Sequence, residues 1–175
     1  MRKLSFEEVQ SKKPSIEDVA NAKRHPIYVI LENVRSLYNV GAIFRTSDAA
    51  MIEKLYLCGI TGAPPRKEIS KTALGAEELV PFEYREDAVE VVRELKEKGV
   101  QVVAIEIAHG SEPYDKFNYE APVCIVLGHE VEGISDELMA EIDNAIEVPM
   151  HGRANSLNVA TCYGIVVYEI LKKLK

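Results

Sequence analysis

The chain has 175 residues, of which 47% are hydrophobic and 28% are charged, a composition typical of a globular protein with one sizeable core. Its 21 lysines and arginines are outnumbered by 28 aspartates and glutamates, and the net charge of −7 argues against a module that binds nucleic acid through an overall basic surface. No apolar stretch is as long as a membrane span, and no apolar segment follows the basic N-terminus as in a secretory signal. We therefore expect a cytoplasmic protein that does not associate with membranes.

Three cysteines, Cys58, Cys124 and Cys162, lie far apart in the chain, each in an apolar segment. Their odd number and wide spacing favour buried thiols in a reducing compartment over a disulfide framework or a C-x-x-C redox pair. The histidines show no ligand spacing with one another, so we expect no metal site.

Residues 1–25 are expected to form a peripheral helical extension, in which Ser15 and Asp18 have the spacing of a capping box. Beyond it, strand-like apolar runs alternate with helix-like stretches. The expected strands are 27–31, 55–58, 80–84, 100–107, 123–127 and 145–148, and the expected helices begin at Asn39, at 86 and at 157. This order predicts an α/β fold with a mostly parallel sheet flanked by helices, in one domain over 26–175.

The last segment begins with the strand 145–148, which ends at Pro149, and continues through a polar loop to Ser156. We expect Ser156 to be the N-cap of a C-terminal helix whose apolar residues recur at intervals of three and four. The polar groups around this N-terminus fit either ordinary capping or a ligand site at the end of a strand. The expected apolar face comprises Leu157, Ala160, Gly164, Val167, Leu171 and Leu174, widened by Val159, Tyr163, Val166 and Ile170.

The loop GHEVEGIS follows a buried strand, and its Gly128, Gly133 and Ser135 have the spacing of a phosphate-binding P-loop. Ile134 stands where that loop has its lysine, and Glu130 would repel a triphosphate, so we reject a nucleotide-hydrolysing P-loop. What remains is a glycine-rich loop at the carboxyl end of a strand, suited to a ligand that is cationic or carries hydroxyl groups.

Arg45 lies among apolar and small residues in the helix expected to be capped by Asn39. It can extend along the flank of that helix or pair with Asp48, and these structural explanations are about as well supported by the residues as a functional one.

Three stretches together resemble the signature motifs of the SpoU/TrmH branch of the SPOUT RNA methyltransferases. They are NVGAIFRTSDA at 39–49, IVLGHEVEGIS at 125–135 and IEVPMHGRANSLNVATCYGI at 146–165. The resemblance implies an α/β domain with a C-terminal deep trefoil knot. It also implies a homodimer that transfers a methyl group from S-adenosylmethionine to a ribose 2′-hydroxyl of tRNA or rRNA.

The resemblance also implies roles for individual residues. Family members hold the cofactor through backbone groups at positions that correspond to Gly128, Val148 and Leu157, with Met150 nearby. The residues that match catalytic or near-catalytic positions are Asn39, Arg45, Glu130, Ser156 and Asn158.

Because the chain is acidic, its affinity for RNA must come from local basic residues. We predict that these are Arg45, Arg66, Lys67, Lys71 and Arg153, summed across a dimer. The alternative function is a non-catalytic RNA-binding or assembly module that keeps the fold. The polar residues at the catalytic positions argue against it, because packing alone does not require them.

Overall fold

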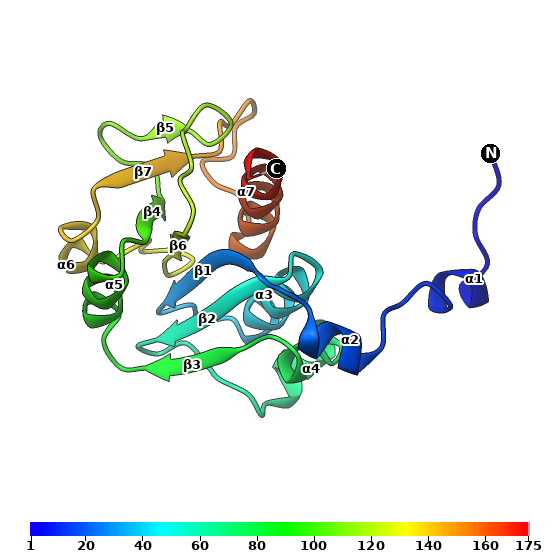
Figure 1. Ribbon diagram of the computed structural model, residues 1–175. Helices are drawn as coiled ribbons and strands as arrows, with labels where there is room; N and C mark the ends of the chain where they lie inside the picture. The colour runs from blue at the N-terminus through cyan, green and yellow to red at the C-terminus, as the bar shows by residue number, and fades with distance from the viewer. Residues whose placement is uncertain (175) are drawn as a thin grey trace.

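The computed structural model describes residues 1–174 and is built on a seven-stranded sheet with the strand order β3-β2-β1-β6-β4-β7-β5 (Figure 1). Every pair of neighbouring strands runs parallel, which confirms the predicted α/β class. The strands are β1 (His25–Glu32), β2 (Ile52–Cys58), β3 (Phe82–Arg85), β4 (Gln101–Ile105), β5 (Glu112–Pro113), β6 (Val123–Leu127) and β7 (Asn144–Glu147).

Helices cover both faces of the sheet (Figure 1). Three of them, α3, α4 and α7, contribute to one buried cluster, and α5 and α6 contribute to the other. The helices are α1 (Phe6–Gln10), α2 (Ile16–Asn21), α3 (Leu37–Ala49), α4 (Lys67–Ala73), α5 (Ala88–Glu97), α6 (Asp136–Met139) and α7 (Val159–Lys173), with a 3-10 turn at Ala76–Glu78.

The central strand β1 shows why its sequence is a continuous apolar run. Ile27, Val29 and Leu31 belong to the cluster beneath α3 and α7, whereas Ile30 belongs to the cluster beneath α5 and α6. Successive side chains of a strand point to opposite faces, so a strand covered on both faces has no polar face.

The helix N-termini lie a few residues from their predicted positions. Ser36, not Asn39, caps α3, and its hydroxyl accepts a 3.4 Å hydrogen bond from the amide of Asn39. Asn158, not Ser156, caps α7, because its side-chain oxygen accepts bonds of 3.0 and 3.3 Å from two amides of the first turn. Both predicted caps were therefore wrong.

The residues that α7 buries are mainly those predicted to widen its apolar face, and not those predicted to form the middle of that face. Tyr163, Val166, Val167 and Ile170 are fully buried, whereas Leu157 precedes the helix. The Tyr163 hydroxyl lies 2.9 Å from the Ser47 hydroxyl of α3 inside the core. This buried pair joins the two helices that lie on one face of the sheet.

The N-terminal residues 1–22, here called the arm, extend away from the body (Figure 1). Its helices α1 and α2 contain no buried residue. The predicted capping box at Ser15 and Asp18 is confirmed, and Ser5 with Glu8 forms a second one. The Arg24 guanidinium attaches the end of the arm by donating to the carbonyl oxygens of Ile52 and Leu79 at 3.1 and 2.7 Å.

Among residues 1–174, no helix combines the length and apolar character needed to cross a bilayer. The trefoil knot and the division into an extension (1–25) and a catalytic domain (26–175) stay predictions.

Candidate functional site

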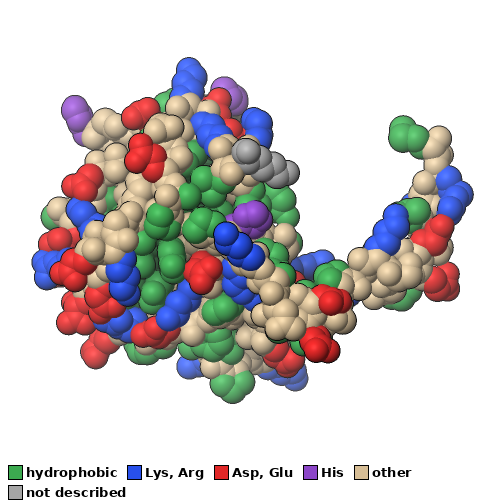
Figure 2. All heavy atoms as spheres, viewed as in Figure 1, with side chains coloured by type: hydrophobic (Ala, Val, Ile, Leu, Met, Phe, Trp, Pro, Cys, Tyr) green, Lys and Arg blue, Asp and Glu red, His purple; other side chains and the backbone are tan. Residues whose placement is uncertain are grey.

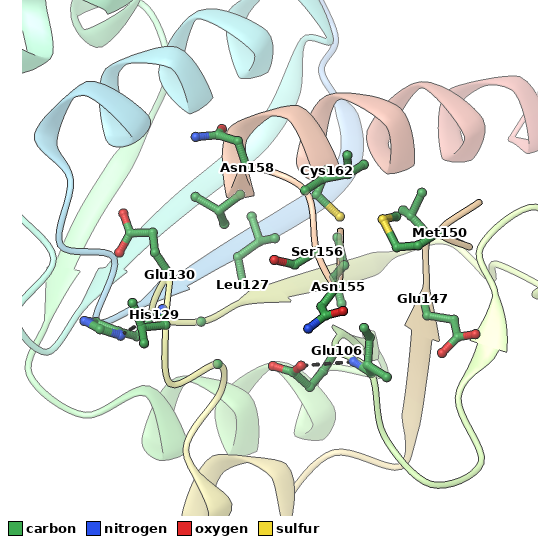
Figure 3. Close-up of a pocket in the computed structure, with 18 residues that line it drawn as sticks. Glu106, Leu127, His129, Glu130, Glu147, Met150, Asn155, Ser156, Asn158 and Cys162 are labelled. Carbon is green, nitrogen blue, oxygen red and sulfur yellow. Dashed lines mark hydrogen bonds between the residues drawn. The ribbon is translucent and has the colours of Figure 1, made fainter. Parts of the chain in front are cut away.

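A cavity of about 430 Å³ opens at the carboxyl ends of the adjacent strands β6, β4 and β7, beside the N-terminus of α7 (Figure 3). Its volume is in the range of small-molecule sites, and its position is the usual one for ligands in parallel sheets. The four residues predicted to hold a cofactor all line it: Gly128, Val148, Met150 and Leu157. Glu130, Ser156 and Asn158 from the catalytic set line it too.

The loop after β6 forms one wall, and two glycines allow it to close on itself. The amide of His129 donates to the carbonyl of Gly133 at 3.0 Å, and the amide of Gly133 donates back to the carbonyl of His129 at 2.9 Å. A Cβ atom at Gly128 would collide with the backbone of Gly133 and Ile134, and Gly133 itself has φ +73°. Both positions therefore require glycine for this wall to form.

Two side chains hold the same loop in place, one within the loop and one just beyond β4. His129 Nδ1 accepts hydrogen bonds from the amides of Val131 and Glu132 at 3.2 and 3.1 Å. The Glu106 carboxylate, just beyond β4, accepts from the amide of Ile134 at 3.1 Å. The loop that lines the cavity is thus held to a neighbouring strand.

Glu130 ties the loop to α3. Its Oε1 accepts from Asn39 Nδ2 and from the amide of Ser36, both at 2.9 Å, and its Oε2 accepts from the amide of Arg35 at 3.0 Å. Asn158 Nδ2 in turn donates to Asn39 Oδ1 at 3.0 Å. Three of the predicted catalytic residues therefore form one hydrogen-bonded chain beside the cavity, Asn158–Asn39–Glu130.

The environment keeps Glu130 ionised. Partial burial alone would raise its pKa, but the hydrogen bonds from Asn39, Ser36 and Arg35 outweigh burial and hold the pKa below its usual value. The carboxylate accepts all of these bonds, and a proton on either oxygen would weaken that oxygen as an acceptor.

Two further carboxylates, Glu106 and Glu147, line the cavity, and no lysine or arginine among residues 1–174 lines it. The Ser111 hydroxyl donates to Glu147 at 2.8 Å. The sequence prediction missed both glutamates, although each lies at the end of a strand. Glu106 was placed inside a strand that in fact ends at Ile105. The acidic lining favours a cationic ligand.

Cys162 corrects the prediction of three buried thiols. Cys58 and Cys124 are buried, but Cys162 is only partly buried and lines the cavity. Burial, and secondarily the carboxylate of Glu106, raises the pKa of the Cys162 thiol to about 11. The group is therefore a neutral thiol at physiological pH and not a nucleophilic thiolate.

The predicted basic residues do not line the cavity. Arg45 is exposed on α3 and makes no ion pair within residues 1–174, so of the two structural explanations the pairing with Asp48 does not hold. The other predicted RNA contacts, Arg66, Lys67, Lys71 and Arg153, are also exposed. Within residues 1–174, no cluster of His, Cys, Asp and Glu has the arrangement of a metal site.

Comparison with known proteins adds to this geometry. Residues 26–168 match the model of the SpoU rRNA Methylase family. The chain is 31% identical over 163 residues to the tRNA (guanosine(18)-2′-O)-methyltransferase of Thermus thermophilus, an alignment that covers 93% of this chain and 83% of that protein.

Solved structures agree. The TrmH/SpoU tRNA modifying enzyme of A. aeolicus matches with a TM-score of 0.81 and 30% identity over 90% of this chain and 80% of that chain. The AdoMet-bound rRNA methyltransferase of Sinorhizobium meliloti matches with a TM-score of 0.80 and 32% identity over 94% of this chain and 62% of that chain. The sequence resemblance is thereby confirmed: the chain belongs to the SpoU rRNA methylase family.

Proposed function

We propose that this protein transfers a methyl group from S-adenosylmethionine to the 2′-hydroxyl of a ribose in tRNA or rRNA. The observation that carries the proposal is the cavity at the ends of β6, β4 and β7, together with the chain Asn158–Asn39–Glu130 at its edge. The similar proteins named above act on tRNA or rRNA, and one was solved with AdoMet.

The residues of the cavity fit this cofactor. S-adenosylmethionine carries a positive sulfonium and no phosphate, which matches a lining with Glu106 and Glu147 and without lysine or arginine. Because Gly128 has no side chain, the loop can close against Gly133 and Ile134 and so place its backbone at the wall of the cavity. We propose that the backbone at Gly128, Val148 and Leu157, with Met150 beside it, holds the cofactor.

The cofactor supplies an electrophilic methyl group, so the chain has to orient the ribose and stabilise charge on its 2′-oxygen. Arg45 stays protonated at neutral pH, and we assign it contact with the substrate phosphate and stabilisation of negative charge on that oxygen. Assistance by Arg45 in removing the proton is a further hypothesis from the family resemblance. Ser156 and Asn158, on the wall of the cavity, offer hydrogen-bonding groups to the ribose, and Glu130 positions Asn39.

The proposal extends to the oligomeric state of the protein and to its location in the cell. A homodimer would add a second set of exposed basic residues to an acidic chain, which supports RNA binding by two copies. The unpaired thiols Cys58, Cys124 and Cys162 support a reducing, cytoplasmic location.

The test is transfer of tritiated methyl groups to purified tRNA and rRNA, with calorimetric titration of S-adenosylmethionine in parallel. A 2′-O-methyl group protects the adjacent phosphodiester from alkali, so label should be recovered in alkali-resistant dinucleotides. Label in bases alone would contradict the 2′-hydroxyl as acceptor. Absence of S-adenosylmethionine binding would favour the non-catalytic module.

Arg45→Ala tests the assignment of charge stabilisation. Because Arg45 is exposed and does not line the cavity, the affinity for S-adenosylmethionine should stay unchanged while kcat falls by about 10²- to 10³-fold. Arg93→Ala on α5 is the control, since this exposed arginine pairs with Glu141 on the other face of the sheet. Unchanged turnover in Arg45→Ala would remove Arg45 from the mechanism.

A further inference from the structure

The arm contains a repeat of ten residues, 2–11 and 12–21, that neither the fold nor the cavity explains. The two copies read RKLSFEEVQS and KKPSIEDVAN. Identical residues fall at Lys3/Lys13, Ser5/Ser15, Glu7/Glu17 and Val9/Val19, and similar ones at Arg2/Lys12, Phe6/Ile16 and Glu8/Asp18.

Both copies adopt the same local structure. Ser5 caps α1 and Ser15 caps α2, each in a capping box with the acidic residue three positions later. Capping accounts for the serine and for that acid. It does not account for the exposed apolar residue at the first helical position, nor for the basic pair that precedes each cap.

Three apolar side chains of the arm stay largely exposed to solvent. Phe6 and Ile16 are 75% and 73% exposed, and Val9 is 52% exposed. Figure 2 shows the arm standing clear of the body, with basic, acidic and apolar side chains spread along it. Helices of five and six residues are marginal alone in water, so an arm that keeps this pattern is suited to packing against another surface.

The order of the charges along the arm indicates which surface the arm packs against. Each copy of the repeat has two basic residues followed by two acidic ones and is neutral as a unit, so the arm reads plus, minus, plus, minus. When a second arm runs antiparallel, centred on Gln10, every charged residue lies opposite one of the other sign. The pairs are Arg2 with Asp18, Lys3 with Glu17, Glu7 with Lys13 and Glu8 with Lys12. Within a single arm, Arg2 and Glu8 already bond to each other at 2.7 Å, so these two exchange partners on pairing, whereas the other two pairs are new ion pairs.

Apolar residues match in the same register. Leu4 lies opposite Ile16, and Phe6 lies opposite Pro14. A parallel arrangement without stagger would place like charges together. A staggered parallel one is not two-fold symmetric, so it leaves ends that can add further copies, whereas the antiparallel arrangement closes at two.

We propose that the arms of two copies of this chain pair antiparallel across a two-fold axis at Gln10. RNA fits less well, because each repeat is neutral and places two carboxylates beside its exposed apolar residue. The pairing covers Phe6 and Ile16 and gives Lys12 and Lys13 carboxylate partners. It is independent of the methyl-transfer reaction, since no arm residue lines the cavity.

Disulfide trapping tests the register. A cysteine at the axis meets its own copy, so the full-length Gln10→Cys variant under mild oxidation should form a covalent dimer on non-reducing gels. Asn21→Cys is the matched control, because the position opposite it lies beyond the end of the partner arm, and the native chain controls for Cys58, Cys124 and Cys162. Absence of a Gln10→Cys dimer, or equal trapping by Asn21→Cys, would overturn the proposal.

Charge reversal tests the complementarity without touching either capping box. In the Gln10→Cys chain, Lys13→Glu places two carboxylates opposite each other and should slow trapping at least threefold. Adding Glu7→Lys restores opposite charges and should restore the rate. A trapping rate that Lys13→Glu leaves unchanged, or that Glu7→Lys does not restore, would contradict the register. Methyl transfer is measured on the same variants, so that failure of the arm pairing can be distinguished from failure of the proposed function.

Discussion

At the scale of single residues, Glu130 connects parts of the chain that are far apart in sequence. Hydrogen bonds to a charged group contribute about 1.5–3 kcal/mol when they are shielded, and less where solvent still reaches the group, as it reaches the partly covered carboxylate of Glu130. Glu130→Gln replaces one acceptor oxygen by an NH₂ group that faces backbone donors. We expect the free energy of unfolding at pH 7 to fall by about 1 kcal/mol, measured by urea titration. Turnover should fall by more than this loss of stability alone would cause.

The pH dependence of that loss follows from the pKa of Glu130. The folded pKa lies below the usual value of 4.5, so the ionised carboxylate stabilises the fold above that value, and this contribution is lost as the pH falls through the folded pKa. The difference in stability between the native protein and Glu130→Gln should be full at pH 7 and shrink below about pH 4. A difference that stays constant into acid would show that charge is not its origin.

Gly128 tests the closed loop. An added Cβ meets the backbone of Gly133 and Ile134, which cannot move aside as a flexible side chain can. Gly128→Ala should therefore displace the loop, cost about 1–3 kcal/mol of stability and weaken binding of S-adenosylmethionine at least tenfold by calorimetry. Gly152→Ala is the control, because a Cβ at Gly152 meets nothing within 4 Å. Equal behaviour of the two variants would show that the loop tolerates a side chain.

At the scale of elements, the N-terminus of α7 combines a cap with a link to the site. Asn158→Ala should cost about 1 kcal/mol, the usual value of an N-cap. Asn158→Asp keeps the capping oxygen but loses the donor to Asn39, so it should recover stability in thermal melts without recovering methyl transfer. Ser156→Ala should leave the melting temperature unchanged, and a destabilised Ser156→Ala would restore Ser156 as the cap.

The strands were predictable from the sequence because apolar runs covered on both faces leave a strong signal, as in β1. The caps were not, because Ser36, Asn39, Ser156 and Asn158 are all good capping residues and the choice depends on where the chain turns. Glu106 was missed for a similar reason: strand ends are the least determined part of a periodic pattern.

At the scale of the whole molecule, the net charge of −7 makes RNA binding depend on local residues. Lys67→Glu with Lys71→Glu reverses two exposed charges on α4 and should weaken RNA binding and lower the slope of log K against log salt by about 1–2. The measurement is fluorescence anisotropy with labelled tRNA over a range of salt. Lys98→Glu with Lys116→Glu has the same net charge at other exposed sites, and equal weakening by both variants would reduce the effect to total charge.

The family resemblance brought Asn39, Glu130 and Asn158 together in a set, but the residues alone could not show their contacts. These side chains come from the first turn of α3, the loop after β6 and the cap of α7, and only the packed sheet places them side by side. Arg45 belongs to the same set by motif, yet it is exposed and lies outside the cavity, so the fold alone does not join it to the other three.

The position of β1 in the middle of the sheet has a consequence during synthesis. One edge of β1 pairs with β2, the next strand along the chain, whereas the other edge waits for β6, which follows β4 and β5. While the ribosome makes the intervening residues, a nascent chain can assemble β1, β2 and β3 but leaves a buried, apolar strand edge open to water and to other chains. We therefore expect this chain to be prone to aggregation in the interval before β6 emerges.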